Sequence, residues 1–218
     1  MSDPRDIALL NSFPVVAVPK YDAFEPLSND GQRLLVAGNG FFLELRRSWL
    51  YAIERCAQRD GAIRYPFGEI KPGLSLNIGA DIAPLIEAFV AIARNRLPDE
   101  CAAVGVYEHA TAHCVIEECE AVNASAAHVT YMPPRLLANE NIAVDLHSHG
   151  VLPAFFSEQD DADDIAAVKL AICVGRLHRV KPVVCARLCL NGLFVPILLN
   201  AYGVYALDEH GSTDELYP

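Results

Sequence analysis

Runs of apolar residues over the last two thirds of the chain predict one long helix followed by a series of strands. Apolar residues recur at helical spacing from Ile82 to Arg96, and Asp81 precedes them. Short apolar runs predict strands over residues 101–107, 112–118, 128–131, 141–149 and 168–174. Asn191-Gly192, between apolar runs at 182–190 and 193–199, is typical of a type I′ hairpin turn. This order predicts an α/β (α+β) fold, with helices packed on a mixed, largely antiparallel sheet.

The first 75 residues follow a different pattern and predict a small α+β appendage. A short apolar strand lies between Pro14 and Pro19, and apolar runs at 34–37 and 41–45 flank the turn Gly38-Asn39-Gly40. Residues 49–57 are amphipathic and predict a helix, while residues 64–73 are rich in turn formers and indicate a linker. We therefore expect an N-terminal appendage at residues 1–75 and a second domain at residues 76–218.

Composition narrows the class of protein. The chain has 218 residues, 52% of them hydrophobic, and a formal net charge of −11, which disfavours nucleic acid or an anionic membrane as partner. No apolar run is long enough to span a membrane, and the N-terminus does not resemble a signal peptide. The seven cysteines form no CxxC pair and indicate reduced, mostly core residues of a cytoplasmic protein.

One stretch carries candidate chemistry. His147 and His149 lie two positions apart in the predicted strand 141–149, so both imidazoles project from the same face. Seven residues later comes Ser157, and three beyond it Asp160, one helical turn away if a helix begins at Ser157. Two imidazoles and one carboxylate, with a fourth position open, are a typical ligand set of hydrolytic zinc.

Each of these features has a simpler explanation when it stands alone. An HxH pair occurs by chance, and Ser157-x-x-Asp160 resembles a helix capping box. The acidic residues 160–164 would complement a helix dipole, and they lack the glycine and glutamate of an EF-hand loop. At this spacing the features together favour a metal site, in which Ser157 can cap the helix while Asp160 binds the metal.

His147-x-His149, seven residues, then Ser157-x-x-Asp160 resembles the HxHx7SxxD signature of the JAMM (MPN-plus, JAB domain) zinc metalloproteases. The resemblance covers about residues 80–200. That family also needs an upstream glutamate, and Pro98-Asp99-Glu100 supplies one in the Pro-x-Glu context of its short prokaryotic members. Gly150 stands where many members have proline. More narrowly, the stretch resembles the A proteins of the bacterial PRTRC gene cassette, which also includes ThiF-related and ParB-related members.

The resemblance implies a JAMM-like core and a role for each motif residue. His147, His149 and Asp160 would bind Zn²⁺, Glu100 would be the general base towards water, and Ser157 would donate to the oxyanion. The implied reaction is hydrolysis of a peptide or isopeptide bond at the C-terminal tail of a ubiquitin-like protein. A ThiF-like activating enzyme of the same cassette is an implied partner.

Two other functions stay open at this point. One is a non-catalytic, zinc-binding scaffold of the MPN type, although such members usually lose ligands that are present here. The other is a zinc amidohydrolase that acts on a small conjugate. The role of Asp145 is also open, because its position in the strand fits both a carboxylate that orients a histidine and one that faces solvent or a loop.

Overall fold

The computed structural model describes residues 3–58, 65–200, 203–207 and 213–215, which form two compact units divided between Asn77 and Ile78. The first unit begins with helix α1 (Pro4–Ser12). It continues with a sheet in the order β1 (Val15–Ala17), β2 (Gly31–Ala37), β3 (Gly40–Arg47), β4 (Leu50–Gln58) and β5 (Gly73–Leu76). β1 runs parallel to β2, and the other pairs are antiparallel. The predicted hairpin at Gly38-Asn39 is therefore confirmed.

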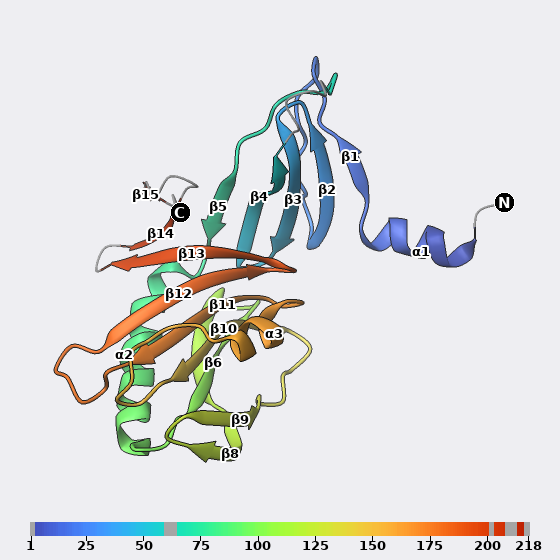
Figure 1. Cartoon of the computed structure of the whole chain (residues 1–218). Coiled ribbons are helices and arrows are strands. Elements are labelled where there is room, and N and C mark those ends of the chain that lie inside the picture. The colour runs from blue at the N-terminus through green and yellow to red at the C-terminus, as the bar shows by residue number, and fades with distance from the viewer. Residues whose placement is uncertain (1–2, 59–64, 201–202, 208–212, 216–218) are drawn as a thin grey trace. The chain divides into compact units, whose positions relative to one another are not determined.

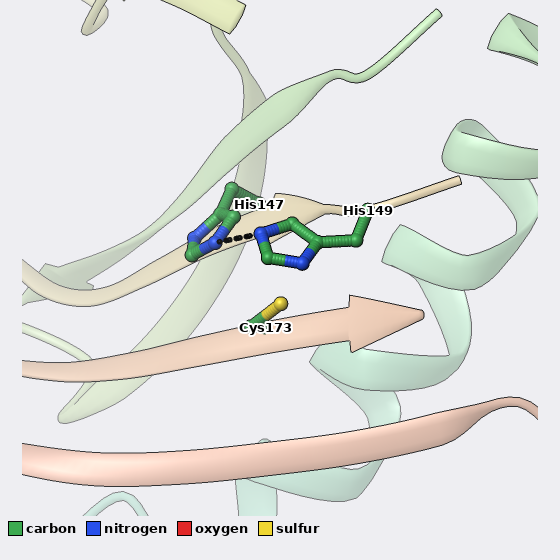
Figure 2. A group of neighbouring side chains, drawn as sticks. All are labelled: His147, His149 and Cys173. Atoms are coloured by element: carbon green, nitrogen blue, oxygen red, sulfur yellow. Dashed lines mark hydrogen bonds between the residues drawn. The ribbon is translucent and has the colours of Figure 1, made fainter. Parts of the chain in front are cut away.

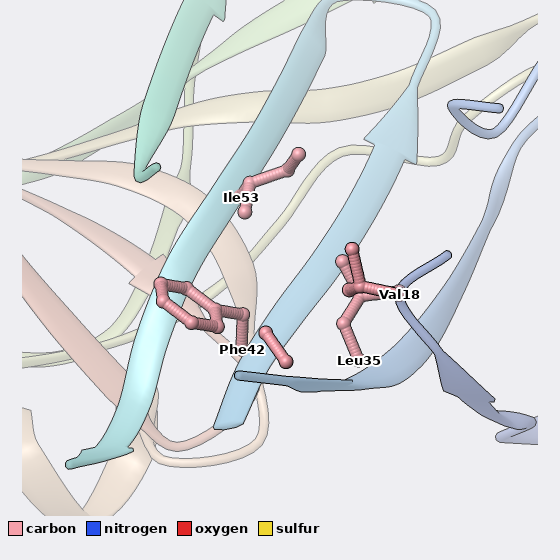
Figure 3. Close-up of a cluster of buried hydrophobic side chains, with 5 residues drawn as sticks. Val18, Leu35, Phe42 and Ile53 are labelled. Carbon is pink, nitrogen blue, oxygen red and sulfur yellow. The ribbon is translucent and has the colours of Figure 1, made fainter. Parts of the chain in front are cut away.

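One face of this sheet carries a buried apolar cluster. Val18, Leu35, Ala37, Phe42 and Ile53 form a buried cluster there (Figure 3). The same face buries the carboxylate of Glu44, which accepts hydrogen bonds from the amide of Leu27 and from the side chains of Arg33 and Tyr51. A charge in this position is stable only because its oxygens are paired.

Two predictions for the first unit are wrong. The expected helix at residues 49–57 is strand β4, because a turn at Ser48-Trp49 folds it back on β3 with Arg47 opposite Leu50. The expected linker is also part of the unit over its described residues, 65–73. The backbone of Gly68 bonds Val18 and Gly38, and Asn39 bonds the backbone of Ile70 from both ends of its amide. Arg64 lies outside the described residues.

The second unit begins with helix α2 (Gly79–Arg96), which starts three residues before the predicted Ile82. Its described sheet contains β6 (Ala102–Glu108), β7 (His113–Glu118), β10 (Glu140–Ser148), β11 (Val168–Gly175), β12 (Val183–Leu190), β13 (Leu193–Asn200), β14 (Gly203–Leu207) and β15 (Thr213–Glu215). The order across the sheet is β15-β14-β13-β12-β11-β10-β6-β7. Only β10 and β11 are parallel among these described neighbours. The predicted mixed, largely antiparallel sheet with flanking helices is confirmed.

Helix α2 lies beside the sheet (Figure 1) and contacts β6, β7, β10 and β14. Its buried residues include Ile82, Leu85, Phe89 and Ala93, which belong to the apolar stripe that the sequence predicts. The approach is close at Gly105, where a side chain would meet Val144 and Leu85. A separate ribbon, β8 (Glu120–Ser125) and β9 (His128–Met132), precedes β10, and the short helix α3 (Glu158–Asp164) follows it. β8 was not predicted, while β9 and α3 were. No helix within the described ranges is long and apolar enough to cross a membrane.

Candidate metal centre

The two histidines converge at the end of β10. His147 lies in the strand and His149 directly after it, and their Nε2 atoms are 3.2 Å apart (Figure 2). A tetrahedral zinc with Zn–N bonds of about 2.0–2.1 Å holds two imidazole nitrogens about 3.3 Å apart, so this spacing fits a shared cation. Burial lowers the pKa of His147, which favours the neutral, metal-binding form of the imidazole.

His149 is held from its other ring nitrogen. Its Nδ1 lies 3.1 Å from the carbonyl oxygen of Pro153, and Phe155 packs edge-on against its ring. A carbonyl acceptor at Nδ1 fixes the tautomer in which Nε2 is free to bind a metal.

Gly150, the next residue, has φ +53°, which proline cannot adopt because its ring fixes φ near about −65°. The glycine in place of the proline found in many JAMM proteins therefore matches the local turn.

Ser157 and Asp160 form a reciprocal capping box at the start of α3. The amide and hydroxyl of Ser157 each lie 2.6 Å from Oδ2 of Asp160, and the amide of Asp160 donates to the Ser157 hydroxyl at 3.2 Å. The other carboxylate oxygen, Oδ1, lies 3.6 Å from Nε2 of His147. Asp160 thus uses one oxygen for the cap with Ser157 and presents the other to His147, so the capping box is compatible with a ligand role for Asp160.

The ionised form of Asp160 is favoured in this setting. Burial works against the charge, but the hydrogen bonds from Ser157 and the nearby imidazoles hold the pKa of the carboxyl below its usual value. An anionic oxygen is therefore available to a cation at neutral pH.

Glu100 reaches the same place from the loop between α2 and β6. Its amide donates to the carbonyl of Ser125 at 2.8 Å, and the residue is 7% exposed. Burial, with a smaller contribution from the charge of Asp160, raises the pKa of Glu100 to about 7. Near neutral pH this carboxyl is present in both protonation states, which suits a group that accepts and returns a proton.

All five predicted site residues line one cavity of about 180 Å³. Glu100, His147, His149, Ser157 and Asp160 come from the α2–β6 loop, from β10 and its end, and from the start of α3. Residues 127–129 and Tyr131, around the β8–β9 turn, form another wall. The donor set, two imidazoles and a carboxylate beside a second carboxyl, is one that zinc accepts.

Cys173 is a further potential ligand that sequence reasoning missed. It lies on β11 directly opposite His147 and is fully buried. Its Sγ and one ring nitrogen of each histidine all lie within 4.8 Å of one another, and Figure 2 shows the sulfur pointing towards both rings. The sequence predicted an ordinary core cysteine, because only the pairing of β10 with β11 brings it to the site.

Asp145 does not orient a histidine through any hydrogen bond described in the structure. Its two carboxylate oxygens accept from the hydroxyl of Tyr131 at 2.8 and 2.9 Å, and Lys169 of β11 forms an ion pair with it. Lys169 also pairs with Asp164 at 2.7 Å. Asp145 therefore ties the β9 ribbon and α3 to the sheet, a role that neither sequence interpretation included.

Comparison with known proteins divides the chain at a similar place. Residues 3–77 match a domain of unknown function, DUF2016, and residues 83–189 match the family described as prokaryotic homologs of the JAB domain. No curated protein matches the chain. Among solved structures, protein DSY2949 from Desulfitobacterium hafniense is similar with 16% identity and a TM-score of 0.38, over 56% of this chain and 85% of that one.

Proposed function

Because the chain contains a JAB-family domain at residues 83–189, and this family includes metalloproteases, we propose that the protein is a zinc-dependent hydrolase of peptide or isopeptide bonds. One observation carries the proposal: Glu100 and Ser157 share a single cavity with His147, His149 and Asp160. A ligand set alone would fit a structural metal. A buried carboxyl with a pKa of about 7 beside it adds a group suited to proton transfer.

The chain's own residues divide the work. His147, His149 and Asp160 hold the metal, which when bound supplies a Lewis acid and an acidified water. Glu100 takes a proton from the attacking water and returns it to the leaving amine. Ser157 donates its hydroxyl proton to the oxyanion, and for this it must turn that proton away from Oδ2 of Asp160, where it points in the resting site.

The substrate class follows from the resemblance, and the cavity is compatible with it. A cavity of about 180 Å³ leaves room beside the site residues for the atoms around a scissile bond. The resemblance implies the C-terminal tail of a ubiquitin-like protein as that substrate. The corresponding partner is a ThiF-like activating enzyme, which prepares such tails for conjugation.

Zinc content is the first measurement. Elemental analysis of the purified wild type should give near-stoichiometric zinc, and Asp160→Ala should lose it. Turnover of a ubiquitin-like fusion should then be zinc-dependent and abolished in Glu100→Ala, while that variant keeps its metal. Folded wild-type protein that takes up no zinc on reconstitution would refute the proposal. A short amide conjugate assayed in parallel separates a peptidase from a small-molecule amidohydrolase.

Cys173 favours a second candidate, the non-catalytic zinc scaffold. A thiolate bound together with the two imidazoles and Asp160 would complete a closed, four-ligand site, which is the pattern of structural zinc. Cobalt substitution distinguishes the two. A thiolate-to-cobalt band in the near ultraviolet, absent from Cys173→Ser, would support the scaffold. Its absence from the wild type, with cobalt bound, supports the open site of a hydrolase.

A further inference from the structure

Helix α3 carries the candidate ligand Asp160 but has almost no apolar surface with which to pack. Its seven residues are Glu-Gln-Asp-Asp-Ala-Asp-Asp, and the one apolar member, Ala162, is exposed. A helix this short is not stable by itself in water. Its position must therefore come from polar contacts with the rest of the domain.

Arg187 of β12 supplies the most extensive of these contacts. The residue is 7% exposed, and its guanidinium bonds Asp161 through Nη1 and Asp164 through Nη2, the latter at 2.7 Å. These two bonds hold the helix at Asp161, one position after Asp160, and at Asp164, about one turn later. Lys169 adds a second tie to Asp164.

The same guanidinium also holds the segment that leads into α3. It lies between the rings of Phe156 and Phe194, 4.1 Å from each centroid. Phe156 directly precedes Ser157, and its ring meets that of His147 edge-on at 6.2 Å. One side chain thus contacts the residue before the helix cap and two residues within the helix.

We propose that Arg187 is a positioning residue, which fixes α3 so that Oδ1 of Asp160 faces His147 and thereby sets the affinity of the centre for zinc. The inference rests on the proposed function only in that Asp160 binds the metal. Arg187 is buried and its Nε has no hydrogen-bond partner among the described residues. Burying a guanidinium costs free energy, which the two carboxylates offset. Loss of either carboxylate therefore leaves the buried charge of Arg187 only partly paired.

The test measures zinc affinity of the full chain by competition with a chelator. Asp161→Asn replaces one anionic acceptor of Arg187 by a neutral amide at a side chain that is 52% exposed, so the fold should survive. Affinity should fall about 10-fold to 100-fold, the usual effect of losing a group that orients a ligand. Glu158→Gln, on the exposed side of the same helix, removes an equal charge without touching Arg187, and its affinity should stay within about 2-fold of the wild type.

Two further variants make the result specific. Arg187→Lys keeps the charge but cannot bridge two carboxylates or stack between two rings, so its affinity should fall at least as far as that of Asp161→Asn. Asp160→Asn gives the limit for a site without its carboxylate ligand. The visible absorption of cobalt-substituted Asp161→Asn and Arg187→Lys should also differ from that of the cobalt-substituted wild type.

The outcomes distinguish the role of Arg187 from the existence of the zinc centre itself. Wild-type protein that binds zinc tightly, with Asp161→Asn and Glu158→Gln indistinguishable, would overturn the role of Arg187 and leave the zinc centre intact. Wild-type protein that binds no zinc would overturn both. Weaker binding in Asp161→Asn alone, with an unchanged thermal midpoint, supports positioning over a general loss of stability.

Discussion

Because the folded protein holds Glu100 in its protonated form, the metal-free protein should become less stable as pH rises towards neutral. Burial and the charge of Asp160 raise the pKa of this carboxyl from its ordinary 4.5 to about 7 in the folded state. Between these two values the unfolded chain loses the proton while the folded protein keeps it. The stabilisation is therefore complete below about pH 4.5 and is lost as pH rises through about 7.

The size of the effect follows from the shift. At about 1.4 kcal/mol per pH unit, a rise in pKa from 4.5 to about 7 corresponds to about 3 kcal/mol. About 2 kcal/mol of this should be lost between about pH 5.5 and about pH 8. Glu100→Gln keeps the shape of the side chain but cannot ionise, so its stability should lack this component.

Urea denaturation of chelator-treated protein measures the difference directly. The free energy of unfolding of the wild type minus that of Glu100→Gln should fall by about 2 kcal/mol over this range of pH. Chelation matters because a bound dication would favour the ionised carboxylate. Glu87→Gln, an exposed carboxylate of α2, should keep the wild-type pH dependence. If the free energy of unfolding changed with pH in the same way for the wild type and Glu100→Gln, the assignment of a raised pKa to Glu100 would be refuted.

Three other substitutions test the surroundings of the centre. Tyr131→Phe removes the hydroxyl that donates to Asp145 and should lower the free energy of unfolding by about 1–3 kcal/mol in urea, with zinc content unchanged. Ser157→Ala removes the cap and the proposed oxyanion donor, so stability should fall by about 1 kcal/mol and kcat by about 100-fold or more, whereas Ser157→Thr should retain much of both. Gly175→Ala places a Cβ 2.5 Å from the carbonyl oxygen of Leu152 and should cost about 1–3 kcal/mol, while Gly73→Ala, which meets nothing within 4 Å, serves as its control. Unchanged stability in any of the three would contradict the contact concerned.

The parts of the fold that depend on local patterns could be predicted from sequence. The apolar stripe of α2, the hairpin at Asn191-Gly192 and the strand of His147 each repeat a short-range rule, and the structure has them. The helix predicted for the amphipathic residues 49–57 was wrong because the conformation of this segment does not depend on a local pattern. Its spacing suits a helix, but pairing with β3 decides its conformation, and pairing is a property of the hairpin as a whole.

The same division applies to the site. The histidines, Ser157 and Asp160 share one short stretch, so their convergence could be inferred from strand and helix periodicity. Glu100 could be found only through resemblance to a family, because an acid after a helix carries no signal of its own. Cys173, Lys169 and Arg187 reach the centre through the register of β10, β11 and β12, which a single sequence does not reveal.

The parallel pairing of β10 with β11 explains why the motif residues meet. Parallel neighbours need a long crossover, and here residues 149–167 form it, leaving β10 at His149 and carrying Ser157 and Asp160 before β11 begins. The far end of β11 then holds the start of this crossover: the amides of Arg176 and Leu177 donate to the carbonyls of Leu152 and Gly150. A hairpin between the same strands would leave no room for a helix. The crossover therefore brings the third proposed ligand, Asp160, to the carboxyl end of the strand that carries the first two. Arg187 of β12, the strand beside β11, then contacts α3 and holds that arrangement.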